Sequence, residues 1–144
     1  MSPTSLFRFI LIASLMASIT SVVAGISLLD TLPQILQDYM AQLESQEMSK
    51  GKALFLLLLV PTVLLLLLIS TIGLWKFKSW ARTLYVILLV AFIPLYPASG
   101  PVVMTSLEAM FRDIALVLEG VLLALMYTGE VNQKFVSTTT NENS

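Results

Sequence analysis

The sequence predicts an all-α membrane protein: a four-transmembrane-helix bundle with an extracytoplasmic amphipathic helix between the first two spans. The chain is 57% hydrophobic and only 12% charged, whereas about a quarter of the residues in soluble domains are charged. Four apolar stretches approach the length of about 20 residues that crosses the hydrocarbon layer as a helix. Three of the eight basic residues lie close together in one short segment between two of these stretches, which indicates the orientation.

The composition excludes several classes of function. The chain has no histidine and no cysteine, so it lacks the usual general base, thiol chemistry and the commonest metal ligands. Its net charge of −1 offers no clustered basic face for nucleic acid. We therefore predict that the protein is not an enzyme and binds no cofactor, metal or nucleic acid. The one enzymatic alternative is a lipid-modifying site built on Glu108, Asp113 and Glu119.

The first predicted span covers about residues 6–29, which are uncharged apart from Arg8. A cleaved signal peptide is the alternative, because residues 22–24 resemble a small-residue cleavage site. We favour a retained span, since the uncharged stretch is longer than the core of a signal peptide. One face of this helix carries a small-residue seam that lets another backbone approach closely. The residues of this seam are Ala13, Ala17, Ser21 and Gly25.

An amphipathic helix outside the membrane is predicted for about residues 31–49. Pro33 suits its first turn, and Gly51 can end it before the next span. Its apolar stripe consists of Leu32, Ile35, Leu36, Tyr39, Met40 and Leu43. The polar side is acidic and rich in amides. Two interpretations are open: the stripe packs over the outer end of the bundle, which we favour because such stripes usually face their own core, or it docks a partner.

The second and third spans, about residues 53–75 and 80–96, are predicted to form a hairpin around a basic turn. Its charges and flanking indole rings are Lys76, Lys78, Arg82, Trp75 and Trp80. Short loops rich in lysine and arginine stay in the cytoplasm, and indole rings settle at the membrane–water interface. Pro61 predicts a kink in the second span. The turn is therefore expected on the cytoplasmic side.

The residues around this turn resemble a known pattern. Gly73-Leu74-Trp75 before the turn and Trp80-Ala81-Arg82 after it are similar to the segment between the second and third spans of several uncharacterised bacterial four-helix inner-membrane families. The resemblance implies a four-helix fold in a bacterial cytoplasmic membrane, and it carries over no activity. In size the chain is also similar to the small four-helix multidrug exporters, but its first span has no acidic residue where those exporters have a glutamate.

The fourth span, about residues 102–128, departs from a plain hydrophobic helix. Its charged residues are Glu108, Arg112, Asp113 and Glu119. Helical spacing places three of them, Glu108, Arg112 and Glu119, near one face, and it allows Glu108 and Arg112 to pair near the outer surface. Glu119 falls near the middle of the membrane, where a lone carboxyl group is expected to be protonated.

Two roles are open for Glu119. Intramembrane ionisable residues often mark ion or proton paths. Alternatively, a neutral Glu119 bonds to hydroxyl groups of neighbouring spans, such as those of Ser14, Ser18 or Thr62, and only fixes helix packing. We favour the packing role, because hydrogen bonds between spans are common.

Residues 1–136 are predicted to form one domain, and the polar residues 137–144 a disordered tail. An even number of spans places both termini in the cytoplasm. The expected role is that of an accessory or interaction protein, and the alternative is a small oligomeric proton-coupled transporter or channel centred on Glu119. Expected partners are the lipid bilayer and, as alternatives, another membrane protein, an extracytoplasmic protein or a second copy. The contact would use the outer helix or the small faces of the first and fourth spans.

Overall fold

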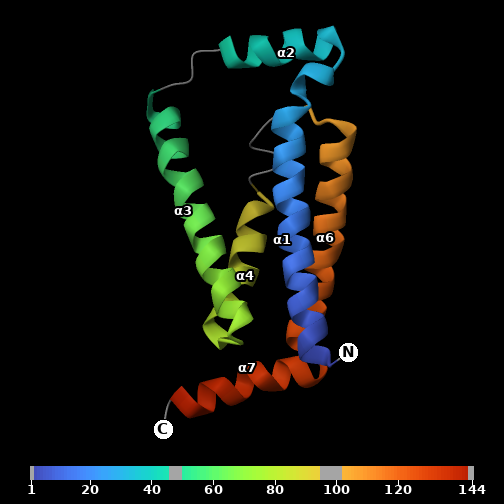
Figure 1. Cartoon of the computed structure of the whole chain (residues 1–144). Coiled ribbons are helices and arrows are strands. Elements are labelled where there is room, and N and C mark those ends of the chain that lie inside the picture. The colour runs from blue at the N-terminus through green and yellow to red at the C-terminus, as the bar shows by residue number, and fades with distance from the viewer. Residues whose placement is uncertain (1, 46–49, 95–101, 143–144) are drawn as a thin grey trace.

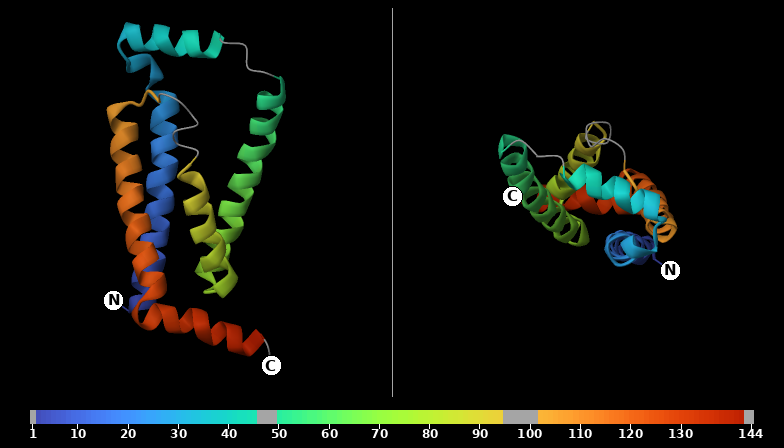
Figure 2. Two further views of the ribbon diagram at one scale, coloured as in Figure 1. Left: turned by 180° about the vertical axis from the view of Figure 1, so that it is seen from behind. Right: turned by 90° about the horizontal axis from the view of Figure 1, so that it is seen from above.

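The computed structural model describes residues 2–45, 50–94 and 102–142, and all regular structure in these ranges is helical. The elements are α1 (Pro3–Ser27), the short 3₁₀ helix η1 (Leu29–Thr31), α2 (Gln34–Ser45), α3 (Lys50–Trp75), α4 (Ser79–Phe92), α6 (Ser106–Tyr127) and α7 (Gly129–Glu142). Four of them, α1, α3, α4 and α6, run along one axis, while α2 and α7 cross its two ends (Figures 1 and 2). We call these ends the α2 end and the α7 end.

Two helices are long and apolar enough to cross a membrane: α1 over its whole length and α3 over Leu57–Trp75. In the most apolar 18-residue stretch of each helix, only 28% of α1 and 17% of α3 is buried. A core helix of a soluble protein buries most of such a stretch, so this exposure favours helices whose apolar side chains face lipid. Helix α4 is apolar but has 14 residues, and α6 carries charges, so the four-span arrangement stays a prediction.

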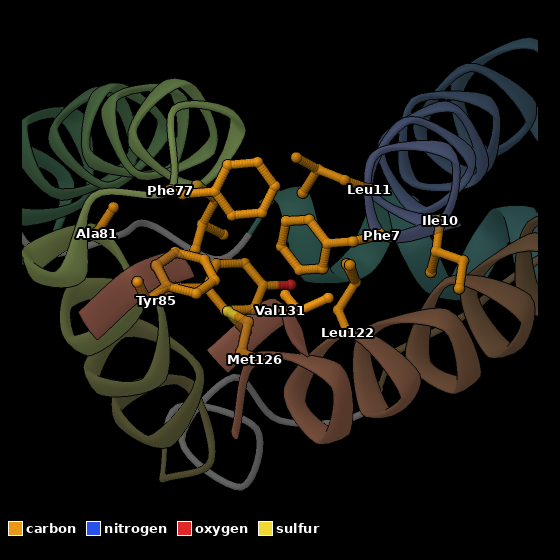
Figure 3. Packing of buried hydrophobic residues seen from close by; sticks show 11 residues of the cluster. Phe7, Ile10, Leu11, Phe77, Ala81, Tyr85, Leu122, Met126 and Val131 are labelled. Carbon is orange, nitrogen blue, oxygen red and sulfur yellow. The ribbon is translucent and has the colours of Figure 1, made fainter. Parts of the chain in front are cut away.

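The bundle is built from two helix pairs, α1 with α6 and α3 with α4. The buried core joins them at the α7 end (Figure 3). It consists of Phe7, Ile10, Leu11, Leu74, Phe77, Ala81, Tyr85, Leu122, Met126, Val131 and Phe135. Three phenylalanine rings, Phe7, Phe77 and Phe135, lie with their centroids 5.3 to 6.0 Å apart. Because these rings come from α1, the α3–α4 turn and α7, they connect both pairs to the crossing helix.

The turn between α3 and α4 ends α3 in a Schellman motif. The Lys78 N–H donates to the Gly73 carbonyl at 2.9 Å, and the Phe77 N–H donates to the Leu74 carbonyl at 3.0 Å. Phe77 occupies the left-handed position with φ 54°, where glycine is usual because a side chain there costs about 1–2 kcal/mol. The ring of Phe77 is buried in the phenylalanine cluster, and this packing offsets the backbone strain.

The two backbones of the α3–α4 hairpin approach closely beside this turn. Gly73 and Ala81 are buried against each other, and a methyl group on Gly73 would meet the Ala81 Cβ atom. Ser70 is fully buried, and its hydroxyl donates to the Ala81 carbonyl at 3.2 Å. Small side chains on both helices therefore set the width of the hairpin.

Some element bounds differ from those predicted. The outer helix begins at Gln34 after the separate turn η1, and residues 46–49 lie outside the described residues. Helix α4 ends at Phe92, and the predicted end of the third span at residue 96 is also outside them. Helix α6 begins at Ser106, several residues later than predicted, because Thr105 caps it there.

Residues 137–144 were expected to be disordered, but α7 continues to Glu142. Val131 and Phe135 are buried four residues apart on one face of this helix, and Phe135 packs on Phe7 of α1. A helix of this length is marginal in water by itself, so docking on the α7 end is what stabilises it. Residues 143–144 lie outside the described residues.

Candidate functional site

Helix α6 begins with a capping box formed by Thr105 and Glu108. The Glu108 N–H donates to Thr105 Oγ1 at 3.2 Å, and the Thr105 N–H donates to Glu108 Oε2 at 3.3 Å. The same carboxyl group lies on Gly25 of α1, where an added Cβ would be 2.8 Å from Glu108 Cδ. Glu108 is therefore a helix cap and a contact between α1 and α6. The segment Thr105-Ser106-Leu107-Glu108 is a capping-box signature, which marks the start of this helix in the sequence itself.

Arg112 and Asp113 form a second, more exposed group on α6. The Arg112 Nη2 atom lies 3.7 Å from Asp113 Oδ1, and the two side chains are 39% and 68% exposed. The Arg112 Nη1 atom also donates to the Met104 sulfur at 3.0 Å. In the described part of the chain Arg112 forms no ion pair with Glu108, so the expected pairing of these two residues is corrected.

Glu119 lies on the inner face of α6. Ala115, Leu122 and Met126, at four residues before it and three and seven after it, are all buried, and they form the helical stripe to which Glu119 belongs. Glu119 itself is half-buried. Tyr85 of α4, also buried, is close enough for the charge of Glu119 to act on its hydroxyl group. The structure thus places a carboxyl group and a phenol between α4 and α6.

Two of the three hydroxyl groups expected beside Glu119, those of Ser18 and Thr62, donate within their own helices. The Ser18 hydroxyl donates to the Ser14 carbonyl at 3.0 Å, and the Thr62 hydroxyl donates to the Leu58 carbonyl at 2.7 Å. No hydrogen bond reaches Glu119 from residues 2–45, 50–94 or 102–142. The packing role predicted for Glu119 therefore lacks the hydrogen bonds on which it depended.

The small-residue seam of α1 lies against α6. The Ser21 hydroxyl donates to the Glu108 carbonyl at 3.0 Å, and Gly25 carries the Glu108 carboxyl group. Ala17 is buried and Ala13 is half-buried. This is the most extensive helix–helix contact of the described chain, so the seam is used within the protein and offers no free surface to a partner.

Helix α2 crosses the α2 end of the bundle (Figure 1). Ile35 is 81% exposed, whereas Leu36 and Tyr39 are only 36% and 37% exposed. Leu32 and Met40 are half-buried, and the side chain of Leu43 lies outside the described residues. The expected burial of this stripe against the spans is not found in the described part of α2. The Gln37 side chain holds α2 on η1 by donating to the Leu32 and Asp30 carbonyls at 2.7 and 3.1 Å.

Cations stacked on aromatic rings surround the core at the α7 end. The Arg8 guanidinium lies 5.0 Å from the centre of the Trp75 ring and 5.4 Å from that of Phe77. The Arg82 guanidinium lies 4.7 Å from the centre of the Tyr127 ring. An exposed contact of this type contributes about 0.5–1 kcal/mol. The sequence indicated only that basic and aromatic residues share this level.

Arg82 also links α4 to the junction of α6 and α7. Its Nη1 atom donates to Asn132 Oδ1 at 2.6 Å and to the Met126 carbonyl at 3.2 Å. The Met126 carbonyl belongs to the last turn of α6, where a positive charge is favoured by the helix dipole. Arg82 is thus a structural residue, although the sequence indicated only a membrane-surface charge.

No group of three carboxylate side chains able to hold a metal ion occurs in the part of the chain that the structure describes. No protein-family model matches the sequence, and no curated protein and no solved structure is significantly similar to it. The α3–α4 turn resembles that of bacterial four-helix families, and the fold and location which this resemblance implies remain predictions.

Proposed function

We propose that this protein is a four-span integral membrane protein of the bacterial cytoplasmic membrane, and that its role is to bind a partner protein through α2. The observation that carries the proposal is the exposed Ile35 in the apolar stripe of α2, beside the partly exposed Leu36 and Tyr39. The other exposed apolar side chains lie mainly on α1, α3, α4 and α6, which a bilayer would cover. Because α2 crosses the end of the bundle, most of it lies outside the hydrocarbon layer of the bilayer. Another surface is therefore needed to cover Ile35.

The charges support an orientation with the α7 end in the cytoplasm. Five of the eight basic residues lie at that end, Arg8, Lys76, Lys78, Arg82 and Lys134, and three lie toward the α2 end, Lys50, Lys52 and Arg112. Among the described residues, five acidic residues lie toward the α2 end, Asp30, Asp38, Glu44, Glu108 and Asp113, and two lie on α7, Glu130 and Glu142. Lysine and arginine are retained on the cytoplasmic side, so α2 would face outward.

The polar face of α2 favours a protein over a lipid surface as its partner. Residues 34–45 contain no lysine or arginine, whereas helices that lie on anionic membranes carry basic residues on their polar face. Asp38 lies beside the apolar stripe and is exposed. A partner with an apolar patch and basic residues at its rim would complement this surface.

Photo-crosslinking in intact membranes tests this role. A photoreactive side chain in place of Ile35 is expected to give one discrete protein adduct, and the same group at Gln34, on the opposite face of α2, none. Asp38→Lys is expected to reduce the adduct several-fold, because it opposes the basic rim of the partner, while Glu119→Gln leaves it unchanged. Crosslinks to lipid alone from Ile35 would contradict the proposal.

A second candidate function, a small oligomeric proton-coupled transporter or channel, is favoured by the site at Glu119. This carboxyl group lies on the inner stripe of α6 near Tyr85, a position typical of proton paths. In liposomes under a pH gradient, the accessory role predicts no proton flux above that of empty liposomes. A flux that Glu119→Gln abolishes would replace the accessory role by the transporter.

A further inference from the structure

An open hollow of about 320 Å³ lies beside the α3–α4 turn at the α7 end. Its lining residues are Ile69, Ile72, Gly73, Lys76, Lys78 and Trp80. Gly73 leaves room beside the Trp80 ring, since an added Cβ would lie 3.0 and 3.1 Å from two atoms of that ring. The absence of a side chain at Gly73 is therefore part of what shapes the hollow.

The hollow is apolar toward the middle of the bundle and basic toward the α7 end. Ile69, Ile72 and Trp80 are 41%, 58% and 47% exposed, so their apolar surfaces are open. Lys76 is exposed just beyond the last turn of α3. No acidic residue occurs in residues 73–82, so Lys76 has no acidic neighbour along the turn.

We propose that this hollow binds one anionic phospholipid. The phosphate group would contact the exposed ammonium group of Lys76, and an acyl chain would cover Ile69, Ile72 and the Trp80 ring. Charge complementarity and the apolar-to-basic order of the lining carry the assignment, because a phospholipid has the same order from tail to headgroup. The inference rests on the proposed membrane insertion with the turn at the bilayer surface.

Quenching of Trp80 fluorescence by brominated lipid tests this site. The chain has two tryptophans, so Trp75→Phe leaves Trp80 as the only reporter. The reconstituted protein is compared in phosphatidylcholine bilayers that contain a small fraction of either brominated phosphatidylglycerol or brominated phosphatidylcholine. The anionic lipid is expected to be enriched about fivefold at Trp80 over its share of the bilayer, the effect of roughly one lysine near the surface.

Two single-charge variants separate a site from general attraction to the surface. Lys76→Gln is expected to reduce the enrichment to the level of the neutral lipid, and Lys76→Arg to retain it. Lys134→Gln removes one charge from the same end of the bundle but outside the hollow, and it is expected to retain the enrichment. An equal loss in Lys76→Gln and Lys134→Gln would overturn the site.

The remaining outcomes distinguish this inference from the proposed function. Equal quenching by anionic and neutral lipid would show that the hollow holds bulk lipid, which overturns the site but leaves membrane insertion intact. Quenching by neither lipid would show that Trp80 lies outside the bilayer. That result would overturn the proposed insertion, and the lipid site with it.

Discussion

Phe7→Ala is expected to lower the free energy of unfolding by about 3 kcal/mol. Phe7 is fully buried and packs on Phe77 and Phe135, so the truncation leaves a cavity where α1, the α3–α4 turn and α7 meet. The transfer from water contributes little for a helix that stays in lipid when the bundle opens, which keeps the loss at the lower end of the Phe→Ala range. Unfolding of the protein in detergent micelles, followed by circular dichroism, measures it.

Phe9→Ala is the matched control for this substitution. Phe9 lies two residues further along α1 and is 62% exposed, so its truncation leaves no cavity and is expected to change the stability by less than about 0.5 kcal/mol. An equal loss in both variants would contradict the location of the core at the α7 end.

Gly73→Ala is expected to destabilise the protein by about 1–3 kcal/mol, the usual cost of overpacking. The added methyl group would meet the Ala81 Cβ atom and the Trp80 ring, and both belong to the helix that packs against α3. The two helices must separate at the turn, which also weakens the hydrogen bond from Ser70 to Ala81. The same detergent unfolding measurement applies.

Gly120→Ala adds the same methyl group as Gly73→Ala, but it is expected to stabilise the protein. Gly120 lies inside α6, and no atom lies within 4 Å of a Cβ added there. Alanine is expected to stabilise this position by about 0.4–1 kcal/mol, because it restricts the unfolded chain. The double variant Gly73→Ala with Ala81→Gly should recover part of the loss, since it moves the methyl group across the contact. A stabilising Gly73→Ala would contradict the close α3–α4 approach.

The helices that local features determine were predictable from the sequence. The length of an apolar stretch indicates α1 and α3, and the spacing of apolar side chains indicates α2, because both signals lie within a few turns of one helix. Helix α7 was missed because its stability depends on Phe135 packing against Phe7, a contact between opposite ends of the chain. The left-handed Phe77 was missed for the same reason, since its ring packs on both of these residues.

Only those features of the candidate site that depend on residue spacing within one helix were predictable from the sequence. The spacing of Ser21 and Gly25 indicated a packing face on α1, and the structure places α6 there. The pairing of Glu108 with Arg112 was expected from their separation by four residues, but capping by Thr105 competes for the same carboxyl group. The proximity of Glu119 to Tyr85 depends on how α4 and α6 are arranged in space, and spacing along one helix does not contain this information.

The central claim is that the chain crosses the membrane four times with α2 outside. The chain has no cysteine, so single cysteines can be labelled in intact bacterial cells with a membrane-impermeant maleimide against a blank parent. Gln42→Cys and Val102→Cys are expected to react from outside. Ser5→Cys, Ser79→Cys and Gln133→Cys are expected to react only after the membrane is permeabilised. Reaction of Gln42→Cys and Ser79→Cys from the same side would show that α3 does not cross the bilayer, and the reversed pattern would place α2 in the cytoplasm; either result would contradict the account.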